Sequence, residues 1–89
     1  MQYDWDEQKN TTNREKHGID FETVVDFCWD SAIEMVDNRN DYGEQRYITF
    51  GLIGHRLFCM VYTIRANTLR IISLRKANSR EVNRYERHY

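Results

Sequence analysis

Arginine side chains are concentrated in the last third of this 89-residue chain. Residues 55–89 carry eight basic and two acidic side chains, a balance of +6, whereas residues 1–54 carry five basic and twelve acidic ones, a balance of −7. Seven of the eight C-terminal basic residues are arginine, whose planar guanidinium fits a phosphate through two parallel hydrogen bonds. The pattern favours a polyanionic partner such as nucleic acid, and the alternative is a solvated surface paired with the acidic half.

Four arginines are candidates for stabilising the charge of a phosphoryl group. They are Arg65 after a central apolar segment, Arg75 at the end of the last predicted strand, and Arg80 and Arg84 on the last predicted helix. Alternation along a strand predicts that Arg70 and Arg75 point to opposite faces of the sheet, so that only one of them serves a given site. For Arg84 the alternative is a solvated helix surface.

Three further residues are candidates for acid–base chemistry or anion binding. A histidine can act as acid or base near neutral pH, which makes His17 a candidate, and Lys16 can bind phosphate as a compact charge. The alternative for both is a helix C-terminus at which cations offset the negative end of the helix dipole. Glu81 is a candidate general base or, alternatively, an acidic residue of a first helical turn.

The N-terminal half predicts a short strand followed by two helices. Residues 2–5 suit a strand, and residues 6–17 are polar helix formers that continue without a breaker up to Gly18. Asp20 is a good N-cap for the second helix, whose apolar stripe at i, i+3, i+4 and i+7 consists of Phe21, Val24, Val25 and Cys28. Cys28 and Cys59 are single thiols in apolar segments, and we expect both to be buried.

The rest of the chain predicts four strands and a final helix. The strands are expected over 32–36, 47–54, 57–64 and 69–74. A hairpin is expected at Ala66-Asn67, and Asn78 or Ser79 caps the helix. This order predicts one α+β domain over residues 1–89, with a small, mostly antiparallel sheet and the helices on one face.

Two runs of residues resemble the BrnT family of bacterial toxins. One is Trp5-Asp6-Glu7, Lys9, Asn13 and Lys16-His17-Gly18-Ile19-Asp20-Phe21-Glu22, and the other is Arg70-Ile71-Ile72-Ser73-Leu74-Arg75-Lys76-Ala77 followed by Arg80-Glu81 and Tyr85. The resemblance covers the chain from Trp5 to Tyr85 and implies a RelE-like fold, a small twisted sheet flanked by N-terminal helices and a C-terminal helix. The chain departs from the family at Lys76, where the arginine-arginine pattern becomes arginine-lysine and a bidentate fork is lost.

The resemblance implies the toxin of a type II toxin-antitoxin system, an endoribonuclease that arrests growth by inhibiting translation. It implies metal-independent transesterification, in which the 2′-hydroxyl of the RNA attacks the neighbouring phosphate. It also implies a BrnA-like ribbon-helix-helix antitoxin, a heterotetramer of two toxins and two antitoxins, and contact with operator DNA through the antitoxin. We expect catalytic roles for Lys16, His17, Arg65, Arg75, Arg80 and Glu81, and RNA contacts from Lys76, Arg84 and Tyr85.

Other functions are compatible with the same residues. The chain can be an antitoxin-binding or RNA-binding module with little or no catalytic activity, and Tyr85, on the apolar side of its helix, can be a core residue. We expect no metal and no cofactor, because the cysteines and histidines show no paired ligand spacing. No apolar run approaches the ~20 residues of a membrane span, and the acidic N-terminus is unlike a signal peptide, so we expect a cytoplasmic protein.

Overall fold

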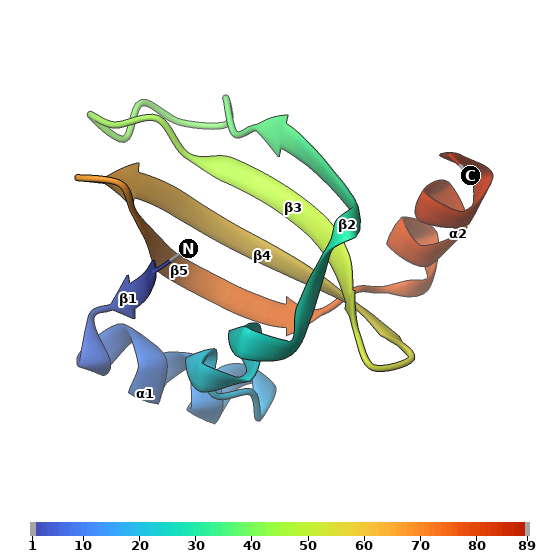
Figure 1. Cartoon of the computed structure of the whole chain (residues 1–89), viewed down its shortest axis with the longest axis horizontal. Helices are drawn as coiled ribbons and strands as arrows, with labels where there is room; N and C mark the ends of the chain where they lie inside the picture. The colour runs from blue at the N-terminus through green and yellow to red at the C-terminus, as the bar shows by residue number, and fades with distance from the viewer. Residues whose placement is uncertain (1, 89) are drawn as a thin grey trace.

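The computed structural model describes residues 2–88, which form one five-stranded sheet with helices on both faces (Figure 1). In chain order the elements are β1 (Gln2–Trp5), α1 (Glu7–His17), the 3₁₀-helix η1 (Phe21–Asp26), β2 (Phe27–Val36), β3 (Tyr47–Ile53), β4 (Arg56–Arg65), β5 (Thr68–Lys76) and α2 (Ser79–His88). The strand order is β1-β5-β4-β3-β2. Three strand pairs are antiparallel and β1 pairs with β5 in parallel, so the expected α+β class is confirmed with a mixed sheet.

One face of the sheet packs against α1 and η1 and forms the core. Phe21 and Val24 of η1 are fully buried against alternate residues of β4 and β5, among them Met60 and Ile71. The ring of Phe27 lies over β3 so closely that a Cβ at Gly51 would collide with it. This contact requires glycine at position 51, since no side chain fits beneath the ring.

The second predicted helix is wrong in length and in its apolar stripe. The segment capped by Asp20 is a single 3₁₀-helix that ends at Asp26, and the extended strand β2 begins at Phe27. Val25 is 69% exposed and Cys28 is exposed as well, contrary to expectation, whereas Cys59 is buried as expected. Aromatic packing explains the switch, because an extended backbone lets Phe27 and Trp29 meet with ring centroids 4.9 Å apart on the core side.

The expectation that all helices share one face is wrong for α2. Glu81, Arg84 and Tyr85 of α2 line cavities together with Met35 and Phe50, whose side chains alternate away from the core. Figure 1 shows α2 beyond the C-terminal end of β5, separate from α1 and η1. The face opposite α1 is therefore a partly open surface with α2 at its edge.

A bulge in β5 changes the direction of its arginines. Tyr62 pairs with Ile71 and Val61 pairs with Ser73, so β5 contains one extra residue at Ile72. The bulge puts Arg70 and Arg75 on the same face, and the prediction that they point to opposite faces is wrong.

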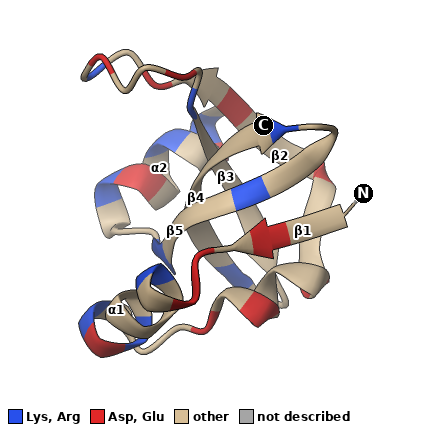
Figure 2. Cartoon of the chain, turned by 90° about the vertical axis from the view of Figure 1, so that its left-hand side faces the viewer, with Lys and Arg blue, Asp and Glu red and all other residues tan. Residues whose placement is uncertain are grey.

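At the edge of the sheet, Arg70 is paired with an acidic residue of β1. Figure 2 shows an acidic segment of β1 beside a basic segment of β5, where Arg70 Nη1 lies 3.3 Å from Asp4 Oδ2. Arg70 therefore lies on the same face of the sheet as Arg75, but its guanidinium is paired with Asp4 of β1.

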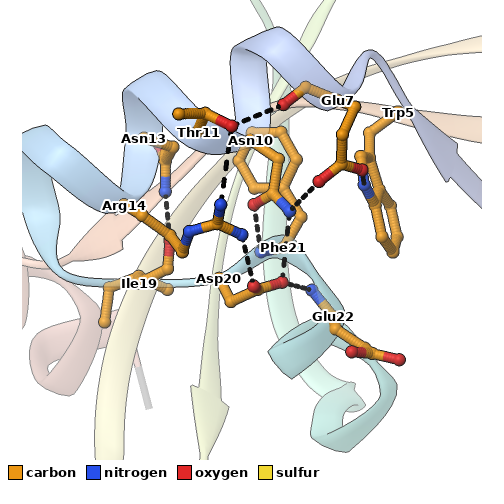
Figure 3. A network of polar contacts seen from close by, with 10 residues as sticks. All are labelled: Trp5, Glu7, Asn10, Thr11, Asn13, Arg14, Ile19, Asp20, Phe21 and Glu22. Carbon is orange, nitrogen blue, oxygen red and sulfur yellow. Dashed lines mark hydrogen bonds and ion pairs between the residues drawn. The ribbon is translucent and has the colours of Figure 1, made fainter.

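Polar side chains of α1 form a network with the loop that follows this helix (Figure 3). Asn10 Oδ1 accepts a hydrogen bond from the Phe21 amide at 2.9 Å, and Asn10 Nδ2 donates to Asp20 Oδ1 at 3.3 Å. Arg14 adds an ion pair to Asp20 at 2.8 Å, and Gly18, at φ 70°, ends α1 as expected. The network fixes the direction in which the chain leaves α1 and so places Phe21 in the core.

Asn13 connects the same helix to the sheet. Its Nδ2 donates to the Leu74 carbonyl at 2.7 Å and to the Ile19 carbonyl at 2.9 Å, and its Oδ1 accepts from the Leu74 amide at 3.1 Å. The pairing of β1 with β5 ends at Ile71, so the amide of Asn13 takes the place of a strand beside the following part of β5. Asn13 is buried, and water cannot replace these bonds without opening the core.

We expect Asn13→Ala to lower the free energy of unfolding by about 2–4 kcal/mol, because it leaves the amide and the carbonyl of Leu74 buried without partners. Denaturant unfolding of the variant measures this, with Asn83→Ala on the exposed side of α2 as the matched control, which should change stability by less than about 0.5 kcal/mol. Equal effects of the two substitutions would contradict the role given to Asn13.

Candidate functional site

A cavity of about 280 Å³ lies on the face opposite α1, and we call it the arginine cavity. Its apolar floor comes from β3 and β4, and three arginines contribute to its walls, one each from β5, α2 and the loop between β2 and β3. The lining residues are Met35, Arg39, Ile48, Phe50, Cys59, Val61, Ser73, Arg75, Glu81 and Arg84. Three guanidinium groups around an apolar floor form a surface suited to a phosphate with an attached base or sugar.

Arg75 and Glu81 form a two-pronged ion pair at the wall of the arginine cavity. Arg75 Nη1 and Nη2 each donate to one Glu81 oxygen at 2.8 Å, and Nη1 also donates to the Lys76 carbonyl at 3.2 Å. Glu81 accepts from the Asn78 amide at 2.9 Å, while Asn78 Oδ1 accepts from the Glu81 amide at 2.9 Å, a capping box at the start of α2. The pair thus joins the end of β5 to the first turn of α2.

The electrostatics of this pair bear on its chemistry. The hydrogen bonds from Arg75 hold the pKa of the Glu81 carboxyl below its usual range, and Glu81 in turn raises the pKa of Arg75. A carboxylate with a lowered pKa is a weak base near neutral pH. In this arrangement Glu81 acts as cap and ion-pair partner, the second of the two roles considered for it.

Burial makes the thiol beside this pair unreactive. Cys59 lies next to Arg75 across the β4–β5 pairing, and desolvation raises the pKa of its thiol to about 11. The thiol is therefore protonated near neutral pH and contributes volume to the cavity floor rather than a nucleophile.

A smaller, more apolar cavity of about 190 Å³ adjoins the arginine cavity under α2. The two cavities share Met35, Phe50, Glu81 and Arg84. Tyr85 lines the smaller cavity, and its hydroxyl donates to the Ser31 carbonyl at 2.7 Å. Tyr85 therefore anchors α2 to β2 while its ring contributes to the cavity wall.

Arg39 was not among the candidates from the sequence, although it lines the arginine cavity. The run DNRNDYG around it has the composition of a polar turn. Nothing in that composition indicates the direction of one arginine. The direction comes from the Asp37 carboxylate, which is buried and accepts from the Arg39 side chain at 2.8 and 2.9 Å.

Lys16 and His17 lie in a different cavity. This cavity, of about 410 Å³, runs between the open side of α1 and the edge of β5, where Ile72 and Ser73 line it. Ser73 lines the arginine cavity as well. The two sets of candidates therefore lie on either side of Ser73 and do not share one cavity.

Arg65, Arg80 and Lys76 line neither the arginine cavity nor its apolar neighbour. Arg65 forms an ion pair with Glu44 at 2.9 Å and lies six residues along β4 from Cys59, a separation of about 20 Å in a strand. Lys76 pairs with Phe58 and so points toward the other face of the sheet. Arg80 is exposed in the first turn of α2.

Two further features of the described residues concern metals and membranes. Within residues 2–88, no three histidine, cysteine, aspartate or glutamate side chains gather as a metal-binding set. Neither α-helix in this range has the length and apolar character that spanning a membrane requires.

Residues 5–81 match the model of a family described as ribonuclease toxin, BrnT, of type II toxin-antitoxin system. The chain belongs to the BrnT family. The BrnT match includes Arg39, Arg75 and Glu81 and ends before Arg84 and Tyr85. No curated protein matches the chain. As a member of the BrnT family, the chain is a ribonuclease toxin with an antitoxin partner.

The ion pair of Glu81 should make the stability of this BrnT protein depend on acid pH. The folded pKa of Glu81 lies below the value of 4.5 expected for an unperturbed carboxyl, so its contribution is complete above that pH and is lost as the pH falls through the folded pKa. We expect Glu81→Gln to lower the free energy of unfolding by about 1–2 kcal/mol at pH 7, with the difference shrinking toward pH 3.

Denaturant unfolding at several pH values measures this difference. Glu86→Gln, on the exposed part of α2, is the matched control and should show little effect at any pH. A cost for Glu81→Gln that stays constant down to pH 3 would show that the charge of Glu81 does not stabilise the fold.

Proposed function

We propose that the chain is a RelE-like endoribonuclease that binds single-stranded RNA across the arginine cavity and cleaves it by metal-independent transesterification. The observation that carries this proposal is the convergence of arginines from separate elements on one cavity with an apolar floor. Guanidinium groups suit the phosphates, and exposed apolar and aromatic side chains suit the bases. Membership of a family of ribonuclease toxins supports the same substrate.

In the proposed reaction the 2′-hydroxyl loses its proton and attacks the adjacent phosphorus. The bond from phosphorus to the 5′-oxygen of the next nucleotide then breaks, which leaves a 2′,3′-cyclic phosphate and a 5′-hydroxyl after that oxygen takes a proton. Arg75 is the residue proposed to stabilise the phosphoryl charge. Arg75 has five N–H groups. Both hydrogens of Nη1 and one hydrogen of Nη2 are donated to Glu81 and to the Lys76 carbonyl. The N–H of Nε and the second hydrogen of Nη2 are therefore available to an oxygen of the phosphate.

We assign the proton transfers to Lys16 and His17 rather than to Glu81, whose carboxylate is paired with Arg75. The lowered pKa of Glu81 opposes general-base action, whereas Lys16 and His17 lie in the neighbouring cavity that Ser73 also lines. RNA that crosses from one cavity to the other would bring its backbone past both sets of residues. Arg84 and Tyr85 are proposed to contact the RNA on the α2 side of the arginine cavity.

The proposed biological role follows from the family. A BrnA-like ribbon-helix-helix antitoxin would neutralise the toxin in the cytoplasm, in a complex of two toxins and two antitoxins whose antitoxin contacts operator DNA. Membership of a type II toxin-antitoxin family supports the antitoxin. Free toxin would arrest growth by cutting RNA needed for translation.

A second candidate function is that of an interaction module that binds antitoxin or RNA with little catalysis. One observation favours it, since Glu81 is the one carboxylate among the described residues lining the arginine cavity and it is bound to Arg75. A cavity with charge stabilisation and no free base can bind RNA without cutting it.

We expect Arg75→Ala to reduce cleavage of a labelled RNA, in the absence of ribosomes, by about 100-fold or more, because it removes stabilisation of the phosphoryl charge. The measurement is the cleavage rate, with identification of 2′,3′-cyclic phosphate and 5′-hydroxyl ends. Arg56→Ala, which removes an exposed arginine from the other face of the sheet, is the matched control and should cut like the parent. Circular dichroism of Arg75→Ala checks that α2 is still folded.

Unchanged cleavage by folded Arg75→Ala would remove Arg75 from the site. An inactive parent that still binds the RNA would favour the interaction module.

The same cleavage should continue in EDTA at the rate measured without it, because the sequence shows no paired metal-ligand spacing. The measurement compares the two cleavage rates, and Mg²⁺ or Zn²⁺ is then added to the chelated sample. Loss of cleavage in EDTA and its recovery with a divalent ion would overturn the metal-independent mechanism.

A further inference from the structure

We propose that Arg39, in the loop between β2 and β3, binds a phosphate of the RNA in the arginine cavity, and that Asp37 and Tyr42 position it for this role. The proposal rests on the proposed function, since it concerns the same cavity. It adds to that site a third guanidinium and a device that orients it.

The anchor of the loop is the Asp37 carboxylate. The side chain of Asp37 is fully buried, with 0% of its surface exposed, and its amide donates to the Arg46 carbonyl at 2.8 Å. The carboxylate accepts four hydrogen bonds. They come from Arg39 Nε at 2.8 Å, Arg39 Nη2 at 2.9 Å, the Arg39 amide at 3.1 Å and the Tyr42 hydroxyl at 3.1 Å.

These bonds hold the guanidinium of Arg39 by one edge only. Asp37 accepts from Nε and from one hydrogen of Nη2, so the outer edge, with Nη1 and the second hydrogen of Nη2, is directed away from Asp37. The side chain of Arg39 is 64% exposed although its partner is buried. The outer edge therefore presents two parallel donors, the arrangement that binds a phosphate bidentately.

The hydrogen bonds from Arg39 keep the pKa of the Asp37 carboxyl well below its usual range. Asp37 is therefore charged near neutral pH. The orientation of Arg39 does not change with pH in that range.

Arg39 adds its charge to a cavity that other arginines already line. The cavity also contains Arg75 and Arg84, and the positive charge of Arg39 acts against the charge of Arg75. Asp37 and Glu81 each offset one of these charges, and the outer edge of Arg39 still faces away from its carboxylate. Phosphates of a single RNA strand would add favourable interactions with Arg39, Arg75 and Arg84 together, because these three residues line one cavity.

The test measures binding of a fluorescent single-stranded RNA in which every 2′-hydroxyl is methylated, so that the nucleophile is blocked and no cleavage occurs. Dissociation constants are determined at several salt concentrations for the parent, Arg39→Ala, Arg39→Lys and Tyr42→Phe. Arg56→Ala, which removes the same charge from the opposite face, is the matched control.

We expect Arg39→Ala to bind about tenfold more weakly, with the slope of log affinity against log salt reduced by about 0.7, the value for one phosphate contact to single-stranded nucleic acid. Arg39→Lys keeps the charge but not the parallel donors, and its affinity should lie between parent and alanine variant with a nearly parental slope. Tyr42→Phe removes one bond to Asp37 and leaves Arg39 intact, so it should weaken binding while the slope stays parental. Arg56→Ala should match the parent.

Two results would overturn the inference, and they are distinguishable. Binding by the parent together with identical affinities and slopes for Arg39→Ala and Arg56→Ala would remove Arg39 from the site and leave the proposed function standing. Absence of salt-dependent RNA binding by the folded parent would overturn both proposals. Circular dichroism of each variant confirms that the comparison is between folded proteins.

Discussion

The hydrogen bonds between the Asn13 side chain and the backbone of Leu74 are the constraint on which the rest of the structure depends. They join residues 61 positions apart and satisfy both backbone groups of a fully buried strand residue. Asn13 also donates to the Ile19 carbonyl in the loop that follows α1. One side-chain amide therefore connects the helix, the loop and the sheet. The core contacts of Phe21 and the cavity between α1 and Ser73 both follow from that placement.

On the opposite face, buried or half-buried carboxylates determine where arginines point. Glu81, 11% exposed, holds Arg75 by its Nη atoms, and Asp37 holds Arg39 by its Nε edge. Each pair uses one edge of a guanidinium and leaves another edge outside. A chain with a net charge of −1 can therefore present a local positive surface at this cavity, since Asp37 and Glu81 lie behind the guanidinium groups that they orient.

The parts of the fold that sequence could predict are those set by local chemistry. The glycine at the end of α1, the hairpin at Ala66-Asn67 with both residues at positive φ, and the cap of α2 at Asn78 are short-range devices and are confirmed. The 3₁₀-helix and the bulge at Ile72 were missed because tertiary packing decides them. An apolar stripe from Phe21 to Cys28 fits a helix in isolation, whereas the extended chain from Phe27 onward is stabilised by contacts of Phe27 with Trp29 and with β3 at Gly51.

The same distinction applies to the site. Arg75 and Glu81 are six positions apart at a strand–helix junction, so sequence could name them as candidates, whereas Arg39 depends on a loop whose direction comes from the burial of Asp37. The arrangement is better prepared for charge stabilisation than for proton transfer, because the interaction with Arg75 that orients Glu81 also lowers its pKa. The edge of Arg75 that Glu81 leaves free, with Nε and the second hydrogen of Nη2, can meet a phosphate without breaking the ion pair. In the proposed reaction the proton transfers therefore fall to residues outside this ion pair, namely Lys16 and His17 in the cavity that shares Ser73 with the arginine cavity.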